Sequence, residues 1–455
     1  MRFILSVLMA ALLLSPGTLA QASAGRAASG PAQTPPMGWN SWDAYGFTIT
    51  EDQFRANVAE LVKLKDLGWK YAVIDEGWYM ADPLGKNLQE RNYQLDGNGL
   101  LIPALARFPS AAGGAGLKPL ADLVHSHGLK FGVHIIRGIP KQAVEANLPI
   151  AGSHFRAADA ANKADLCSWD DGNYGIRDTA AGQAYYDSMV KLFADWGIDF
   201  IKIDCVADHP YVGSEIRQIS QAIKHSGREM VLSLSPGPTS LTHAAEVGKL
   251  AQMWRIADDT WDGWSFAPKD WPNGVLTGFD KLAQWRGHAK PGNWPDADML
   301  PFGSLRPHPG WGEPRASRLS VDEMRTMFTL WAIARSPLIL GGNLTELDAA
   351  TRAVITNKDV IAVNQTVWDS HPVDVAQTSA RVWVAQGGAH KKPTRYVAVF
   401  NTADTPLDFA ARWQDLSLPV PTALQDLWGA ETNPARADGL KIHLAPHASV
   451  MYRLQ

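Results

Sequence analysis

Short apolar runs that alternate with helix-length stretches constrain the fold of this chain most strongly. Eight such runs occur between residues 35 and 342. In order along the chain, they span residues 35–42, 71–78, 129–135, 199–205, 230–236, 252–259, 293–299 and 336–342. Their unbroken apolar character is typical of parallel strands that are buried on both faces. We therefore expect an α/β protein in which helices cover a parallel sheet.

Helix signals fill the segments between these runs. Thr50 and Gln53 have the spacing of a capping box, which predicts the start of a helix. Further helices are expected over residues 180–194 and 321–334. Eight strand–helix units favour a (β/α)8 TIM barrel over residues 35–365. An open doubly wound sheet is the alternative, although the chain has no Gly-rich dinucleotide fingerprint to support it.

The pattern changes beyond residue 365. Five runs there alternate in polarity or are β-branched, and turn-rich stretches separate them. These runs span residues 381–386, 395–401, 423–428, 440–445 and 450–454. Residues 366–455 are therefore expected to form a second, antiparallel β domain.

The first residues resemble an export signal rather than a part of the fold. Arg2 precedes an apolar run over residues 3–14, and Pro16 and Gly17 then break any helix. The run is too short for a membrane span, so residues 1–22 are expected to be a signal peptide. Residues 23–34 would then be a flexible lead-in. We expect an exported protein, periplasmic or secreted, whose mature form does not insert into a membrane.

The composition excludes several classes of protein. The 42 Lys and Arg residues face 46 Asp and Glu residues, so the chain lacks the basic excess of a nucleic-acid binder. Two Cys cannot build a disulfide-dense scaffold or a four-thiolate zinc site. The 18 Trp are the unusual figure, because flat apolar side chains often line recognition sites. The Trp residues at or near strand ends are expected to form the stacking surface and wall of a binding pocket rather than core; they are Trp39, Trp42, Trp78, Trp254, Trp261 and Trp294.

Polar and charged residues gather at the carboxyl ends of the apolar runs. They are Asp75, Glu76, His134, Asp204, Ser235, Arg255, Asp258, Asp259, Asp296 and Asp298. In a barrel these ends converge on one face, where active sites form. Carboxylates at the ends of buried strands are otherwise unfavourable.

Two of these carboxylates have the pattern of a catalytic pair. Asp204 follows Lys202 by two residues, and a neighbouring ammonium keeps a carboxylate ionised and able to act as a nucleophile. Asp259 follows Arg255 in a Trp-rich stretch, whose apolar walls would favour a protonated donor. One ionised and one protonated carboxyl are what glycoside hydrolysis needs. Asp258 is a rival for the donor role, and structural salt bridges are the alternative for both positions.

Six motifs in order resemble those of glycoside hydrolase family 27. They are PPMGWNSWDAYG (35–46), VIDEGW (73–78), FIKIDC (200–205), WRIADD (254–259), WPDADML (294–300) and SPLILGGNL (336–344). This family contains α-galactosidases, α-N-acetylgalactosaminidases and β-L-arabinopyranosidases. The resemblance implies a TIM barrel followed by a C-terminal antiparallel β-sandwich. It also implies a carbohydrate substrate, retaining hydrolysis, and neither a metal nor a cofactor.

The resemblance also implies roles for individual residues. The nucleophile falls on Asp204, and the acid/base falls on Asp259 rather than on Asp258. The substrate-binding positions implied by the motifs are Trp42, Asp75, Glu76, Lys202, Arg255 and Asp298, with Asp75 and Glu76 on the sugar's O4 and O6. The family's disulfide falls on Cys167 and Cys205, next to the nucleophile.

Three departures from the family pattern bear on specificity. The family usually has Asp at the position of Glu76, and the extra methylene would crowd a C6 hydroxymethyl group. The first expectation is an exo-acting α-D-galactosidase, and Glu76 makes a β-L-arabinopyranosidase the alternative. Ser235 resembles the small residue of the N-acetylgalactosaminidases. His134 stands where a Tyr is common, either bonded near Asp204 or simply buried. A catalytically silent carbohydrate-binding barrel is the non-enzyme alternative.

Overall fold

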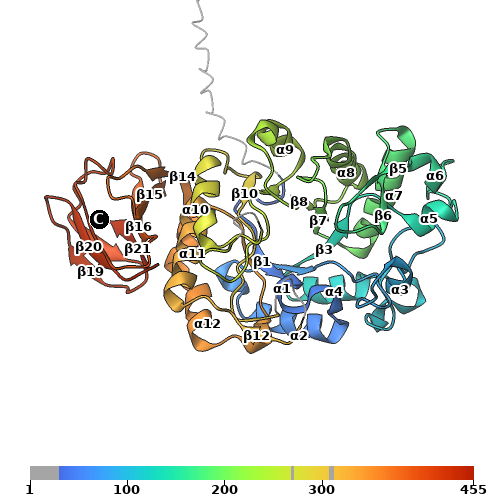
Figure 1. Cartoon of the computed structure of the whole chain (residues 1–455), viewed down its shortest axis with the longest axis horizontal. Helices are drawn as coiled ribbons and strands as arrows, with labels where there is room; N and C mark the ends of the chain where they lie inside the picture. Colours follow the sequence, from blue (N-terminus) through green and yellow to red (C-terminus); the bar gives the residue numbers. More distant parts are fainter. Residues whose placement is uncertain (1–29, 268–270, 307–311) are drawn as a thin grey trace, which may run out of the picture.

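The computed structural model describes residues 30–267, 271–306 and 312–455 (Figure 1). The predicted signal peptide, residues 1–22, and most of the predicted lead-in lie outside the described residues. The carbonyl of Ala32, near the start of the described chain, accepts hydrogen bonds from Gly292 N–H at 2.9 Å and from Trp294 Nε1 at 2.7 Å. No helix within the described ranges is long and apolar enough to cross a membrane.

Eight parallel strands form the central sheet, and one strand lies in each of the eight predicted runs. In the order of the sheet they are β10 (Trp294–Asp296), β9 (Met253–Arg255), β8 (Val231–Leu234), β7 (Phe200–Asp204), β3 (Lys130–Ile136), β2 (Tyr71–Ile74), β1 (Met37–Asn40) and β13 (Leu338–Leu340). A parallel bridge between Leu300 and Leu340 joins the chain after β10 to β13. The Leu300 N–H donates to the Ile339 carbonyl at 2.7 Å, and the sheet closes into the predicted TIM barrel.

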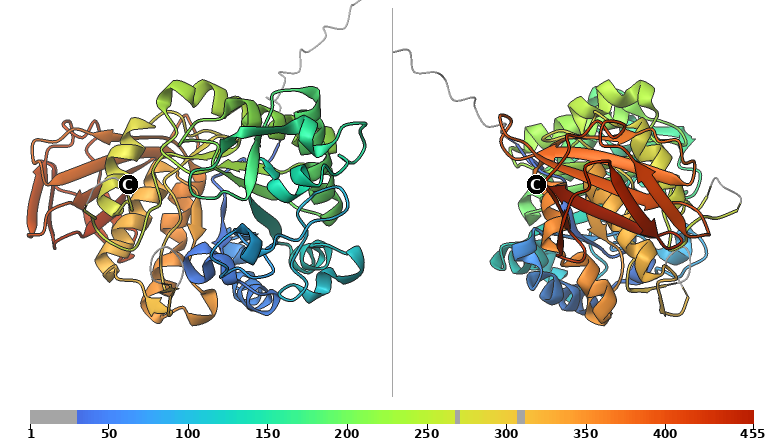
Figure 2. Two further views of the ribbon diagram at one scale, coloured as in Figure 1. Left: turned by 45° about the vertical axis from the view of Figure 1, so that its right-hand side comes forward. Right: turned by 90° about the vertical axis from the view of Figure 1, so that its left-hand side faces the viewer.

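Helices surround the barrel (Figures 1 and 2). The longer ones are α2 (Glu51–Val62), α4 (Lys118–Ser126), α7 (Ala180–Trp196), α8 (Gly213–Ser226), α9 (Ala244–Leu250), α10 (Val275–Gln284), α11 (Val321–Ala334), α12 (Ala349–Ile355) and α13 (Lys358–Thr366). Short helices and strands decorate the connections: α1 (Trp42–Tyr45), α3 (Leu88–Arg91), α5 (Lys141–Glu145), α6 (Ala157–Ala160), β4 (Ile139–Pro140), β5 (Ala161–Leu166), β6 (Asn173–Ile176), β11 (Ser304–Leu305) and β12 (Arg315–Ala316). The capping box at Thr50 is present, and the predicted helices correspond to α2, α7 and α11.

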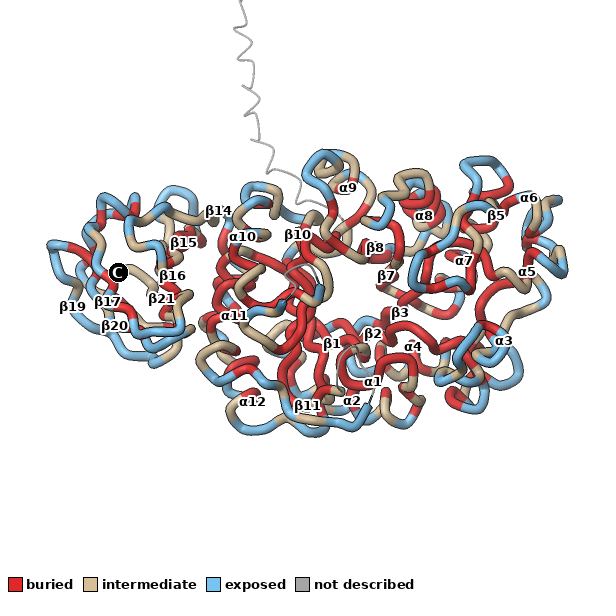
Figure 3. The backbone as a smooth tube through the Cα atoms, in the orientation of Figure 1, coloured by how far each residue is buried: buried red, intermediate tan, exposed pale blue. Residues whose placement is uncertain are grey.

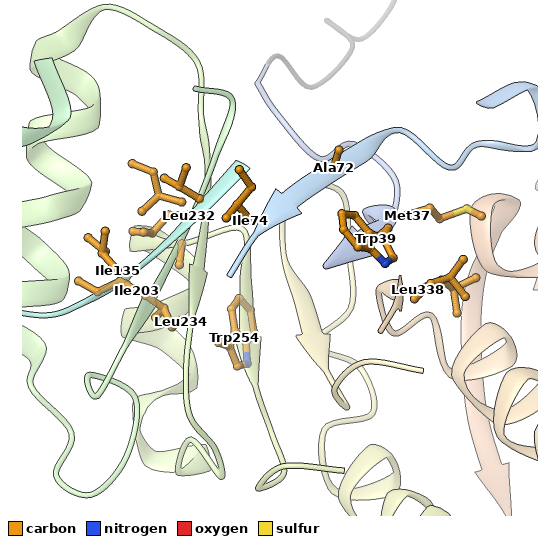
Figure 4. Packing of buried hydrophobic residues seen from close by; sticks show 14 of the residues in the cluster. Met37, Trp39, Ala72, Ile74, Ile135, Ile203, Leu232, Leu234, Trp254 and Leu338 are labelled. Atoms are coloured by element: carbon orange, nitrogen blue, oxygen red, sulfur yellow. The ribbon is translucent and has the colours of Figure 1, made fainter. Parts of the chain in front are cut away.

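Most of the tryptophans expected at the sugar site belong to the core instead. Trp39, Trp78, Trp254, Trp261 and Trp294 are at most 2% exposed. Figure 4 shows Trp39 and Trp254 among the aliphatic side chains of the strands, and Figure 3 shows the barrel strands as buried. The expectation of sugar-stacking surface is therefore wrong for these five. Large indoles fill the barrel interior and the layer beneath the helices, where close packing is needed.

A β-sandwich domain follows the barrel, as the family resemblance implies. One sheet has the order β14 (Val367–Val373), β15 (Ala380–Gly387), β16 (Thr394–Asn401), β21 (Ser449–Leu454), β18 (Ala423–Asp426) and β19 (Thr432–Pro434), and the other pairs β17 (Leu407–Ala411) with β20 (Leu440–Leu444). β14, β17 and β19 were not predicted, because β14 is polar, β17 is short and β19 is an exposed edge strand ending in Pro434. The domain packs against α11, where Trp428 Nε1 donates to Thr329 Oγ1 at 2.9 Å.

Candidate active site

Asp75 is held rigidly by residues from two other strands at the carboxyl end of the barrel. It follows β2 directly, and its Oδ2 accepts hydrogen bonds from Asn40 Nδ2 at 2.6 Å and from Lys202 Nζ at 2.9 Å. Asn40 ends β1, and Lys202 lies in β7. Burial acts to raise the pKa of Asp75, but the charge and hydrogen bond of Lys202 hold that pKa well below its ordinary value. Asp75 is thus a fixed, ionised acceptor.

Asp204, the predicted nucleophile, ends β7 beside His134 of the neighbouring strand β3. Its Oδ1 accepts a hydrogen bond from the Cys205 N–H at 2.7 Å, and its Oδ2 lies 3.5 Å from His134 Nε2. Burial acts to raise the pKa of Asp204, but the His134 hydrogen bond and the charges of His134 and Lys202 lower it overall. The side chain keeps 16% exposure, so an ionised oxygen can reach a substrate.

Glu76 follows Asp75 in the chain and lies near Asp170. It is 6% exposed, and burial, followed by the charges of Asp170, Asp204 and Asp75, raises its pKa well above the ordinary value. Asp170 belongs to the connection between β5 and β6, and it accepts hydrogen bonds from the Tyr93 hydroxyl at 3.1 Å and from the Gly172 N–H at 2.7 Å. The raised pKa favours the protonated form of Glu76, which can donate a hydrogen bond.

Arg255 organises the opposite side of the site. Its Nη1 pairs with Asp298 Oδ1 at 2.9 Å, and its Nη2 donates to Asp259 Oδ1 at 3.2 Å. Asp298 also accepts a hydrogen bond from the Thr260 N–H at 2.7 Å. Burial raises the pKa of Asp298 to about 7 against the opposing charge of Arg255. The other Asp259 oxygen accepts from Trp271 Nε1 at 3.4 Å.

The surroundings of Asp259 differ from those that its sequence context predicts. Its side chain is 38% exposed, so the expectation of apolar walls around it is wrong. Asp258, the rival donor, does not share the Arg255 contact: its Oδ1 lies 3.7 Å from His209 Nε2. Burial raises the pKa of Asp258, although Arg255 opposes this.

Two further predicted residues lie at the same end of the barrel. Ser235 follows β8 and is 2% exposed, in the turn whose backbone accepts from the Val206 N–H at 3.1 Å. Trp42 begins α1 directly after β1 and packs edge-on against Phe47 at 5.1 Å between ring centroids. Trp42 remains half-buried, unlike the five core tryptophans.

The predicted disulfide between Cys167 and Cys205 is present. Cys205 follows the nucleophile position, and Cys167 lies three residues before Asp170. The bond therefore ties the connection that carries Asp170 to the carboxyl end of β7. Within the described residues, no cluster of three or more His, Cys, Asp or Glu side chains has the arrangement of a metal site.

Known proteins resemble this chain over nearly its whole length. Residues 162–366 match the family described as alpha galactosidase A, and residues 377–454 match the alpha galactosidase C-terminal beta sandwich domain. The alpha-galactosidase A of Cellvibrio japonicus is 30% identical, over 93% of this chain and 92% of its own length. A GH27 β-L-arabinopyranosidase from Geobacillus stearothermophilus is 40% identical, over 93% of this chain and 97% of its own, with a TM-score of 0.87.

The chain belongs to glycoside hydrolase family 27. It is accordingly a glycosidase whose substrate is a carbohydrate. A Bacillus halodurans protein assigned provisionally as an α-N-acetylgalactosaminidase is also similar, with 36% identity over 93% of this chain and 98% of its own and a TM-score of 0.81.

Asp43 is a site residue of this family 27 member that the sequence analysis missed. It is 2% exposed, and its Oδ2 is buried without a hydrogen-bond partner among the described residues. Burial, then the charge of Asp298, raises its pKa well above the ordinary value. The charges of Lys202, Asp259 and Asp75 also affect this pKa, so Asp43 lies near both the Asp75–Lys202 pair and Asp259. Its position directly after Trp42 in the first motif was the available signal.

Asp170 was missed for a different reason. It lies in a long connection, far in sequence from both Glu76 and Tyr93. The Cys167–Cys205 bond, the pairing of β6 with β4 and β5, and the Tyr93 hydrogen bond bring it to the site. The site as a whole sets ionised carboxylates beside carboxyls whose pKa is raised, which is the separation that acid/base chemistry on a glycosidic bond requires.

Proposed function

We propose that this glycosidase releases terminal sugars of the galactose ring configuration, both α-D-galactosyl and β-L-arabinopyranosyl, with a preference for the arabinoside. The buried Glu76, where the family usually has Asp, carries this proposal. The 40% identity with a protein described as a β-L-arabinopyranosidase supports it, because α-galactosidases such as that of Cellvibrio japonicus are less similar.

The proposed reaction is a retaining double displacement. Asp204 attacks the anomeric carbon while Asp259 protonates the leaving oxygen. Asp259 then removes a proton from water, and this water releases the sugar from Asp204. The lowered pKa and partial exposure of Asp204 support the first role, and the 38% exposure of the Asp259 side chain, at the same end of the barrel, supports the second. Retention requires carboxyl groups about 5–5.5 Å apart.

The proposed preference follows from the length of Glu76. β-L-arabinopyranose has the stereochemistry of α-D-galactopyranose but lacks C6, and Asp75 is already fixed by Asn40 and Lys202. The longer side chain is buried, at 6% exposure, and its pKa is influenced by the charge of Asp170, so the extra methylene takes up space that a hydroxymethyl group would need. One methylene in a binding site typically changes discrimination by about 1–3 kcal/mol, or roughly 10–200-fold.

Parallel kinetics on three chromogenic substrates test the proposal: an α-galactoside, a β-L-arabinopyranoside and an α-N-acetylgalactosaminide. Glu76→Asp should raise kcat/KM for the galactoside relative to the arabinoside by about tenfold or more. The exposed Glu145→Asp is the matched control and should leave the ratio unchanged. An unchanged ratio in Glu76→Asp refutes the role of Glu76.

The mechanism has its own tests. Asp204→Asn should abolish nearly all turnover while sugar binding persists. Proton NMR of the first product formed should show the same anomeric configuration as the substrate, and the opposite anomer would refute double displacement. Hydrolysis of none of the three substrates would favour the silent carbohydrate-binding barrel. We also propose that the protein is exported, supported by its N-terminal pattern and its disulfide.

A further inference from the structure

A cavity of about 270 Å³ lies at the opposite end of the barrel from the site. It is enclosed by α10, the starts of β10 and β13, and strands β14 and β15 of the second domain. Lys290 and Arg335 line it and precede β10 and β13, whereas the site residues follow those strands. Figure 1 shows β14 and β15 beside α10 and α11, where the two domains meet.

Arg335 differs from the other buried arginines of the described chain. Arg107 donates to backbone carbonyls, Arg137 pairs with two acids, and Arg255 pairs with Asp298 and Asp259. Arg335 is 7% exposed, its Nε is fully buried without a hydrogen-bond partner, and it has no ion pair within the described residues. The guanidinium instead makes a cation–π contact with the face of Trp294, 4.6 Å from the ring centroid.

A buried cation without an acceptor is unfavourable. Burial alone lowers the pKa of Arg335 to about 10, and no acid opposes the shift. Losing hydration without a compensating partner destabilises a charge strongly. The single acid that lines the cavity, Asp369, lies beyond ion-pair distance of Arg335 and instead has His371 at 3.4 Å. Arg335 is therefore available to pair with an anion in the cavity.

The rest of the lining narrows the chemistry of that anion. Trp368 is the exposed indole of the lining, at 37%, whereas Trp285 and Trp383 are at most 3% exposed and belong to its packed wall. Arg286 and Lys290 add two cations to Arg335. A planar guanidinium matches a carboxylate through two parallel hydrogen bonds. Indole faces bury the apolar face of a pyranose ring while its hydroxyls bond elsewhere. The volume lies just below the range of about 300–1,000 Å³ for drug-sized ligands, which suits one sugar ring.

We propose that this cavity binds a carboxylate-bearing sugar, a uronic acid residue, through Arg335. The cavity would hold an acidic residue of a glycan, while the active site at the other end of the barrel hydrolyses a different part of the same glycan. It does not depend on which neutral sugar the enzyme releases. Arg335, Trp368 and Lys290 have no place in the catalytic machinery, so their substitution can be separated from activity.

Isothermal titration of the full protein with glucuronate at low salt tests the site. Saturable binding is expected, and it should persist in Asp204→Asn, because the catalytic site is not involved. Arg335→Gln should weaken binding about tenfold or more. The exposed Arg217→Gln, on α8, should not change it. Trp368→Ala should also weaken binding. Because Trp368 is exposed, this variant tests the site even if Arg335→Gln does not fold.

Three comparisons decide the outcome. Glucose should bind much more weakly than glucuronate, which shows that the carboxylate matters. Inorganic phosphate and acetate should also bind more weakly, which shows that the ring matters. Equal binding by glucose, equal binding by phosphate, or unchanged affinity in both Arg335→Gln and Trp368→Ala would each overturn the proposal. Basal hydrolysis by each variant confirms that it has folded.

Discussion

His134 should set the acid limit of activity through Asp204. The buried imidazole lies 3.5 Å from Asp204 Oδ2, and an ionised carboxylate only accepts, so Nε2 must carry the shared proton. His134 Nδ1 has no hydrogen-bond partner within the described residues. Replacing His134 by Phe therefore removes the hydrogen bond that opposes burial.

The magnitude follows from the kind of bond that is lost. Hydrogen bonds to charged groups contribute about 1.5–3 kcal/mol, and the 3.5 Å separation favours the lower end. Since 1.36 kcal/mol corresponds to one pKa unit, the pKa of Asp204 should rise by about one unit. Asp204 must be ionised to attack, so activity is lost as pH falls through its pKa. The lowered pKa places the wild-type acid limb below the ordinary carboxyl range, and His134→Phe should move the limb upward.

The assay is the pH dependence of kcat/KM on the chromogenic arabinopyranoside, which reports the free enzyme. His125→Gln is the matched control, because His125 pairs with Asp199 on the outside of the barrel at 2.7 Å. It should leave the acid limb in place. An acid limb in His134→Phe that coincides with that of the wild type would refute the assignment, even if kcat itself fell.

Three further predictions concern stability. Replacing Cys167 and Cys205 by Ser frees a loop of 38 residues and should lower the free energy of unfolding by about 4 kcal/mol; an unchanged urea midpoint contradicts this. Glu215→Ala removes a buried partner of Arg137 and should lower the free energy of unfolding by about 3 kcal/mol in chemical denaturation; an unchanged midpoint contradicts this. Because burial raises the pKa of Asp43, its contribution to wild-type stability should be lost as pH rises from about 4, the ordinary carboxyl pKa, through the raised pKa. The stability of Asp43→Asn should fall less over the same pH range. Parallel curves of unfolding free energy against pH for the two proteins would contradict the assignment.

The barrel could be predicted because its strands are buried on both faces. That burial selects continuous apolar runs, which no other part of the chain shows so regularly. The ends of the strands could not be predicted from the same runs. Residues 252–259 contain a strand of only three residues, β9, and the apolar residues Ile256 and Ala257 that follow it belong to the connection.

The partners within the site could be predicted only in part. The spacing of Lys202 and Asp204 predicted that the ammonium keeps the nucleophile ionised, and the charge of Lys202 does lower the pKa of Asp204. The hydrogen bond of Lys202 goes instead to Asp75, which follows β2, two strands away in the sheet. Asp204 receives its hydrogen bonds from His134 and the Cys205 backbone. Sequence spacing fixes which side chains share a face, but the tilt and closure of the barrel decide which of them meet.

The carboxyls of this site greatly outnumber its cations, and that imbalance explains how the site can work. Lys202 and Arg255 cannot neutralise all the surrounding acids, so burial must leave some of them protonated. The pKa is raised at Asp43, Glu76 and Asp298, by burial first, and lowered at Asp75 and Asp204, where Lys202 or His134 outweighs burial. Protonated neighbours can donate to sugar oxygens without repelling the nucleophile's charge. Adding cations to neutralise the site would remove those donors, so a crowded acidic site with few cations serves glycoside hydrolysis better than a balanced one.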